Sequence, residues 1–144
     1  MTDDLELARA CAAHMFADDR ASQELGIAID IPAAGSATAT MSVTPTMING
    51  HDVCHGGYLF TLADTAFAFA CNGYNQVSVA AGASIEYLAP VRAGDRLTAR
   101  AIERHRGRRS GTYDVEVHNQ QQRLVAVFRG RAAALGRPLL PDPT

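Results

Sequence analysis

Asp64 is the residue whose type and place in the sequence best suit it to chemistry. It lies in the middle of the segment from Tyr58 to Cys71, in which most other side chains are apolar. A carboxylate in such surroundings loses hydration, and an unpaired buried charge is strongly destabilising. The segment therefore predicts one of two roles. Asp64 is either a structural acid satisfied by a hydroxyl or amide elsewhere, or a base or nucleophile with a pKa tuned by burial.

Two glycines, Gly56 and Gly57, precede this segment at the point where a helix would begin. N–H groups in a first helical turn have no partner within the helix and carry partial positive charge. The missing side chains let a substrate oxygen approach them closely, as an oxyanion hole requires. Two glycines can equally make only a tight turn. His55 and Asn49 place side-chain donors beside the same amides, and spacing alone leaves His55 as a carbonyl ligand or a helix cap.

The run from His51 to His55 has the residue types of a metal site without the spacing of one. Zinc needs three or four convergent ligands, and consecutive residues in a turn cannot all face one ion. A nucleophilic role for Cys54 lacks an identifiable separate histidine and orienting acid. We therefore expect no metal and no cysteine chemistry here.

A basic run from Arg104 to Arg109 is the second group of residues with chemical potential. Such a run is usually a solvated face. The alternative is a dock for phosphate groups, which suits the planar fork of arginine. Arg108, Arg109 and Arg92 on the neighbouring loop are the candidates for that role.

The elements that position these residues follow from the hydrophobic pattern. An amphipathic helix is predicted over Asp3 to Arg20, and a helix that is apolar on every side over Tyr58 to Cys71. Strands are predicted over residues 36–44, 77–88, 97–105, 112–118 and 124–134. Short turns between the later strands imply antiparallel pairing. This is an α+β architecture in which the sheet curls around one helix, and because one copy cannot cover that helix completely we expect a partner chain.

The bulk properties exclude several classes of protein. With 144 residues the chain has room for a single domain, 1–144. A formal net charge of -2 argues against nucleic acid or anionic membrane as partner. The amino terminus is acidic, no apolar stretch is long enough to span a membrane, and three cysteines form no CxxC pair. We expect a cytoplasmic protein, with a frayed tail over Pro138 to Thr144.

The sequence resembles the hotdog-fold thioesterases and, among them, the phenylacetate-degradation branch. The resemblance rests on the runs NGHDVCHGG (49–57), LADTAFA (62–68), YLAP (87–90), AGD (93–95), GTYDV (111–115) and NQQQ (119–122). It implies a long central helix wrapped by a curved antiparallel β-sheet, and dimers that pair into homotetramers. It also implies hydrolysis of acyl-CoA without metal or cofactor.

The resemblance further implies roles for particular residues. Asp64 would be the catalytic carboxylate, Gly56 the oxyanion amide, and Asn49 and His55 ligands near the thioester. Thr65 would assist at the water or the carboxylate. In some relatives a hydroxyl on the strand after the helix positions the water, and here that role is vacant or belongs to Ser84 or Thr65.

The acyl group implied by the resemblance is phenylacetyl or a ring-hydroxylated derivative. Apolar residues that could line its pocket, and that would serve equally well as core, are Met47, Phe60, Phe67, Phe69 and Tyr87. Two other functions stay open: a hotdog hydratase or dehydratase, whose Asp-x-Asn-Pro-x-His pattern is absent, and a non-catalytic acyl-CoA sensor, for whose second domain there is no space. Asp64 as general base and Asp64 as nucleophile remain equally compatible with the sequence.

Helix geometry predicts that each site is built from two chains. Gly56 and Asp64 are eight residues apart, which is roughly 12 Å along one helix axis. A base must come within about 3 Å of its water, which must lie about 3 Å from the carbonyl carbon. A second copy with its helix antiparallel would bring its Asp64 opposite the first copy's Gly56.

Overall fold

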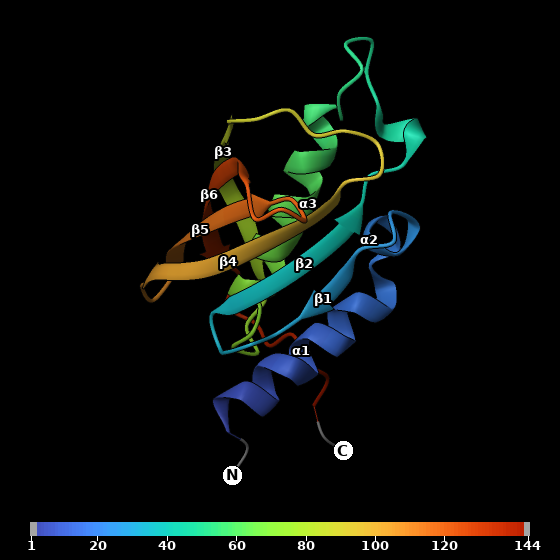
Figure 1. The fold of residues 1–144 in the computed structure, drawn as a ribbon. Coiled ribbons are helices and arrows are strands. Elements are labelled where there is room, and N and C mark those ends of the chain that lie inside the picture. Colours follow the sequence, from blue (N-terminus) through green and yellow to red (C-terminus); the bar gives the residue numbers. More distant parts are fainter. Residues whose placement is uncertain (1–2, 143–144) are drawn as a thin grey trace.

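The computed structural model describes residues 3–142 and has one central helix on a six-stranded antiparallel sheet (Figure 1). The helices are α1 (Asp4–Asp18), α2 (Arg20–Glu24) and α3 (Gly56–Cys71), with a 3-10 turn η1 (Pro45–Met47). The strands are β1 (Ala28–Asp30), β2 (Ser36–Ser42), β3 (Ser78–Tyr87), β4 (Arg96–Arg106), β5 (Ser110–His118) and β6 (Leu124–Ala134). Their order in the sheet is β1-β2-β4-β5-β6-β3. The α+β architecture predicted from the sequence is confirmed.

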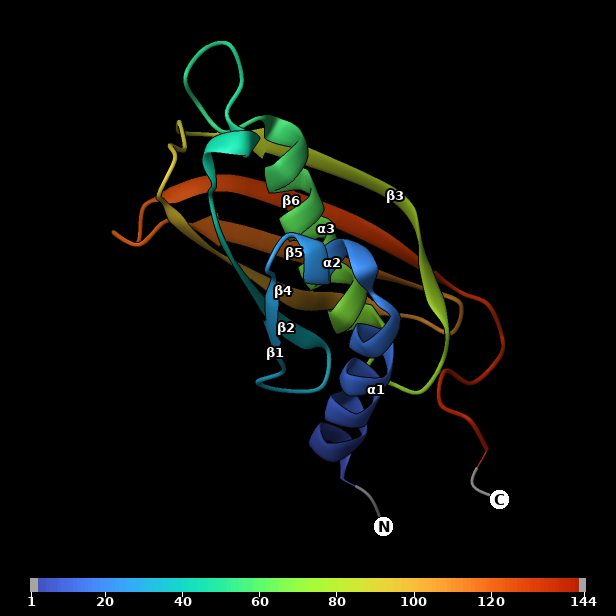
Figure 2. The ribbon, with the colours of Figure 1, turned by 90° about the vertical axis from the view of Figure 1, so that its right-hand side faces the viewer.

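The sheet curves around α3 because its inward-facing residues pack on that helix (Figure 2). Along β5 the side chains alternate, with Tyr113, Val115 and Val117 buried against the core. The ring of Phe67 on α3 packs so closely on β6 that a Cβ at Gly130 would lie 2.8 Å from it. This contact brings α3 close to β6 at its middle.

The amino-terminal region differs from the sequence-based prediction. α1 ends at Asp18 rather than Arg20, because the Asp19 carboxylate accepts hydrogen bonds from the Ser22 backbone and hydroxyl and so begins a second helix. The short elements α2 and β1 were not predicted. α1 packs on the far end of α3, where the Phe16 and Phe69 rings lie 6.3 Å apart.

One chain leaves one face of α3 uncovered, as expected from the sequence. Gly57, Thr61, Asp64, Thr65 and Ala68 recur at helical spacing on one face of α3, and none of them is buried. The edge strand β3 beside that face has no buried residue either. One copy of the chain therefore leaves the face that carries Asp64 uncovered.

The remaining sequence-based elements agree with the structure to within a residue or two at each end. Within residues 3–142, no helix is both long and apolar enough to cross a membrane. The tail expected over Pro138 to Thr144 is described as far as Asp142, and its last two residues lie outside the described part. Within the described part, the Leu139 and Leu140 amides donate to the Asn75 side chain.

Candidate active site

The loop before α3 is organised by Asn49. Its side-chain oxygen accepts hydrogen bonds from the His51 amide (2.9 Å) and the Val53 amide (3.3 Å), while its own amide donates to the Val53 carbonyl (2.8 Å). These bonds hold a tight loop that projects beyond the sheet at the amino-terminal end of α3 (Figure 1). The Asn49 side-chain NH2 group makes no hydrogen bond with any other described residue, so it can donate to a ligand.

His55 caps α3 and in doing so presents a donor. Its Nδ1 accepts a hydrogen bond from the Gly57 amide at 2.9 Å. An accepting Nδ1 carries no proton, so the neutral ring must carry its proton on Nε2. The cap and the carbonyl-ligand interpretations of His55 are therefore compatible, since Nε2–H remains available while Nδ1 holds the helix.

The Gly56 amide is free at the start of the helix. Gly57 donates to His55, whereas the Gly56 N–H has no acceptor among residues 3–142. A hollow of about 450 Å³ opens beside it, lined by Val53, Cys54, Gly56, Leu59, Tyr87, Leu88, Ala89, Pro90 and Val91. A free N–H with the partial positive charge of a helix terminus, on a residue that lines a largely apolar hollow, has the properties of an oxyanion donor.

Asp64 is half-buried on the open face of α3 and unpaired. Its carboxylate makes no hydrogen bond or ion pair with another residue of the described chain, and burial raises its pKa. The sequence allowed Asp64 to be a structural acid with a partner, or a base or nucleophile. The structure shows no partner for a structural acid within the described chain. Thr65 lies next to it and donates its hydroxyl hydrogen to the Thr61 carbonyl at 2.7 Å, so Thr65 can only accept a hydrogen bond from a water or a substrate.

The structure places Ser84 away from the site. Ser84 pairs in register with Arg129, whose guanidinium bonds to Asp114 on the sheet face opposite α3. Directly opposed residues in an antiparallel pair share a face, so the Ser84 hydroxyl lies on the outer surface with Arg129. Of the two hydroxyl candidates named from the sequence, Thr65 is the one beside Asp64.

The five residues predicted to line the acyl pocket do not line a single pocket in one chain. Tyr87 lines the hollow beside Gly56. Phe67, Phe69 and Met47 are buried in the core, and Phe60 packs edge-on against Phe128 with ring centroids 5.4 Å apart. In a single chain only Tyr87 among them is open to a ligand in this hollow.

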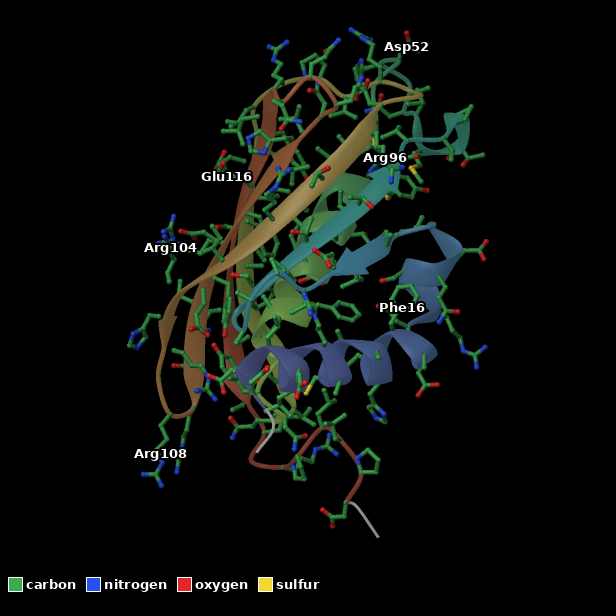
Figure 3. All side chains as sticks on the ribbon, turned by 60° about the horizontal axis from the view of Figure 1, so that its bottom comes forward. Phe16, Asp52, Arg96, Arg104, Arg108 and Glu116 are labelled. Carbon is green, nitrogen blue, oxygen red and sulfur yellow. The ribbon has the colours of Figure 1, made fainter. Side chains whose placement is uncertain are left out.

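The candidate phosphate ligands lie at two ends of the molecule. Arg92 donates to the Asp52 carbonyl (3.0 Å) and so belongs to the loop before α3. Arg108 and Arg109 lie at the tip of the β4–β5 hairpin, beside a hollow of about 440 Å³. Figure 3 shows Asp52 and Arg108 at opposite ends of the fold. One chain does not bring these arginines to a single ligand.

Cys54 and the neighbouring histidines do not form a reactive centre. Burial, with a smaller effect of the Asp95 charge, raises the pKa of the Cys54 thiol to about 11, so the nucleophilic thiolate is scarce at neutral pH. Across the described chain, no cluster of three or more His, Cys, Asp and Glu side chains is arranged to hold a metal ion.

A long helix on the concave face of a six-stranded antiparallel sheet is the architecture of the hotdog class of α+β proteins. Residues 51–126 match the model of the thioesterase superfamily. The chain belongs to that family.

Individual relatives agree with this assignment. The chain is 50% identical over 122 residues to the acyl-coenzyme A thioesterase PaaI of Escherichia coli K12, which covers 85% of this chain and 87% of that one. The solved structure of the E. coli PaaI protein from the phenylacetic acid degradation operon has a TM-score of 0.92 and 46% identity, covering 94% of this chain and 99% of that one. Streptococcus mutans smu.793, solved bound to acetyl CoA, has a TM-score of 0.74 and 28% identity, covering 78% and 90%.

Proposed function

We propose that this chain hydrolyses acyl-CoA thioesters to a free acid and CoA. The observation that carries the proposal is that one helix of a thioesterase-family fold contains both a free Gly56 amide and an Asp64 without a partner in the described chain, whose pKa is raised by burial. The two groups match the two needs of the reaction, a donor for the carbonyl oxygen and a base or nucleophile for the attack.

The carbonyl oxygen of the thioester accepts a hydrogen bond from the Gly56 amide, and its developing negative charge is stabilised by the helix terminus. His55 Nε2–H and the Asn49 NH2 group lie on the same loop and can donate to the thioester or its neighbouring amide. Asp64 takes a proton from water as the water oxygen bonds to the carbonyl carbon, or attacks that carbon itself to give a mixed anhydride that water then cleaves. In either route the carbon–sulfur bond breaks and the CoA sulfur leaves with the electron pair.

We propose that two chains build each site and that the homodimers pair into homotetramers. α3 is continuous from Gly56 past Asp64, so the roughly 12 Å separation along one helix axis applies. The uncovered face of α3 and the exposed edge strand β3 are adjacent surfaces that a second copy would bury. With a twofold axis, Asn49, His55 and Gly56 of one chain would face Asp64 of the other.

The same pairing suggests where the CoA phosphates bind. β3 begins at Ser78, whose side chain shares a small polar pocket with Arg108, and ends at Tyr87 beside Gly56. Antiparallel pairing of two β3 edges would set the Ser78 end of one chain against the Tyr87 end of the other. We propose that Arg108 and Arg109 of the partner, with Arg92, bind the phosphates of a substrate whose thioester lies at Gly56.

For the acyl group we propose phenylacetyl or a ring-hydroxylated derivative. Two observations support this proposal. The similar E. coli PaaI protein comes from the phenylacetic acid degradation operon, and the apolar hollow beside Gly56 is lined by Tyr87 and Leu59. An aromatic ring can stack or pack edge-on there. We expect kcat/KM for phenylacetyl-CoA to exceed that for straight-chain esters. A clear preference for long aliphatic chains would contradict the aryl assignment.

The test of the activity is release of free thiol from a panel of acyl-CoA esters, with the Asp64→Asn variant as control. Thiol release by the wild-type protein and not by the variant supports the proposal. Binding of the esters without thiol release would indicate a sensor, and hydration of an enoyl-CoA without release would indicate a hydratase. Single-turnover hydrolysis in heavy-oxygen water distinguishes the two routes, because label found in Asp64 excludes the pure general-base route.

A further inference from the structure

Tyr87 contacts the proposed oxyanion glycine in two ways. Its hydroxyl donates a hydrogen bond to the Gly56 carbonyl at 2.9 Å. Its ring lies against the Gly56 Cα so closely that a Cβ there would be 2.8 Å from both Cζ and Oη, and 3.1 Å from Cε1. Only glycine therefore fits at position 56 while the Tyr87 ring keeps its place.

The sheet holds Tyr87 in this position. Tyr87 is the last residue of β3 and pairs in register with Ala126 of β6. Directly after it, the Leu88 and Ala89 amides both donate to the Val125 carbonyl, at 2.8 and 3.3 Å. The ring thus extends from a fixed backbone to the start of α3, and Tyr87 also lines the hollow beside Gly56.

A glycine at the start of a helix has a cost for catalysis. Without a Cβ its backbone can rotate more freely than that of any other residue, so the direction of its N–H depends on the contacts of the peptide groups on either side. The Gly56 N–H has no partner of its own in the described chain, because a partner would occupy the oxyanion position. The Gly56 N–H shares a peptide group with the His55 carbonyl, which accepts from the Tyr58 amide at 3.0 Å, and the Gly56 carbonyl on the other side of the Cα is held by the Tyr87 hydroxyl.

We propose that Tyr87 is a positioning residue that fixes the orientation of the Gly56 amide toward the substrate carbonyl. This inference rests on the proposed thioesterase function. The Gly57 N–H that bonds to His55 and the Gly56 carbonyl that bonds to Tyr87 belong to one peptide group, and the Tyr87 ring also packs on the Gly56 Cα from the sheet side. Together these two contacts hold the amide in place before substrate binds, which is the condition for effective oxyanion stabilisation.

The first test is Tyr87→Phe, which keeps the ring and removes only the hydroxyl. We expect kcat to fall about 3–10-fold, the range for loss of one ordinary hydrogen bond, with KM changed less than about twofold because ground-state contacts are kept. The matched control is Tyr74→Phe, which removes a hydroxyl bonded to Glu103 at 2.9 Å, far along the chain from the site. The control should lower thermal stability without lowering kcat. An unchanged kcat in Tyr87→Phe, or a change confined to KM, would overturn the proposal.

The second test is a double-mutant cycle between positions 56 and 87. Gly56→Ala keeps the backbone N–H but forces its methyl group against the ring, so we expect kcat to fall at least about 30-fold through displacement of the amide. Tyr87→Leu alone should cost less. The double variant should be more active than Gly56→Ala alone, because the smaller side chain gives the methyl group room. If the double variant is only as active as the product of the two single effects predicts, the ring does not position Gly56.

A substrate-free measurement separates this inference from the proposed function. The Gly56 amide resonance in nitrogen-15 NMR should shift in Tyr87→Phe and stay unchanged in Tyr74→Phe. An unshifted resonance would refute the contact whatever the activity of the protein. Conversely, a shifted resonance in a protein that releases no thiol would leave the contact in place and reject the thioesterase proposal.

Discussion

At the scale of single residues, the features that suit Asp64 to its proposed catalytic role also make it destabilising for the fold. It shares its face of α3 with Thr61, Thr65 and Ala68, no partner within the described chain offsets its charge, and burial raises its pKa. A residue that was only structural would have a hydrogen-bond partner, because unpaired buried charge is destabilising. The same feature makes Asp64 a better base near neutral pH than an exposed aspartate.

We expect Asp64→Asn to lower turnover at least ~100-fold, the low end for loss of an acid–base group. The fold should be kept, since the two side chains have nearly the same shape. The measurement is thiol release, with circular dichroism to verify folding. A correctly folded variant with near wild-type turnover would exclude Asp64 as the catalytic carboxylate.

The same variant should be more stable than the wild type at neutral pH. When folding raises the pKa of a carboxyl, the folded state holds more protons than the unfolded state between the two pKa values, so stability falls as pH rises through that window. Asp64 therefore destabilises the fold above its folded pKa and has no such effect below its ordinary value of 3.8. Tm of Asp64→Asn should exceed that of the wild type at pH 7, and the two should converge near pH 4. A variant that melts lower at pH 7 would contradict the raised pKa.

At the scale of elements, one carboxylate links β4, β5 and the α3–β3 connection at the end of the sheet far from Gly56. Glu103 on β4 accepts hydrogen bonds from Tyr113 of β5 (2.8 Å) and from Tyr74 in the α3–β3 connection (2.9 Å). The Arg106 guanidinium lies 3.7 Å from the centroid of the Tyr74 ring. Burial and the bond to Glu103 raise the pKa of Tyr74 to about 12, so both hydroxyls stay protonated donors at neutral pH.

Removing this acceptor should destabilise the fold without affecting the reaction. Glu103→Ala leaves the Tyr113 hydroxyl buried and unpaired, which costs about 2 kcal/mol, or roughly 4–8 °C in Tm for a chain of this length. Glu103→Gln is the matched control, because its side-chain oxygen can still accept. A Glu103→Ala protein that melts like the wild type would show that water replaces the carboxylate.

At the scale of the whole molecule, the proposed site is incomplete within a single chain. The open face of α3, the exposed β3 edge and the two separated arginine groups all call for a second copy. The part of the partner's carboxylate and the part of the partner's arginines can be tested separately.

Complementation tests the shared site. Asp64→Asn and the double variant Asn49→Ala with His55→Ala are each expected to be inactive. After co-refolding, random pairing makes about half of the dimers mixed, each with one intact site, so roughly a quarter of wild-type activity should return. Confirmed mixed dimers without recovered activity would place the whole site within one chain.

Phosphate binding is tested with Arg108→Ala combined with Arg109→Ala. We expect KM for CoA esters to rise about tenfold and to lose part of its salt dependence, because charge-assisted bonds to phosphate are removed. KM for the matching pantetheine ester, which has no phosphate, should not change. The control is Arg100→Ala, which removes an exposed arginine on β4, away from the hairpin tip. If KM for the CoA ester is unchanged, the hairpin is only a solvated face.

Local patterns in the sequence determined the fold class, the central helix and most strands of this protein. Alternation along β5 and the apolar run of α3 each extend over enough residues to define a period, and the order of elements leaves few ways to pack them. The short elements α2 and β1 have five and three residues, too few for a period to be visible. The odd position of Asp64 and the glycines before it could likewise be recognised from local chemistry alone.

Contacts between residues distant in the chain were decided only by the tertiary structure. Sequence allowed His55 as cap or ligand and Ser84 as a water ligand, but the direction of the ring and the face of the strand depend on packing and register. The contact of Tyr87 with Gly56 joins residues 31 positions apart, and it exists because the register of β3 on β6 places that ring at the start of α3. No local pattern encodes that register, since it follows from the packing of the whole sheet around α3.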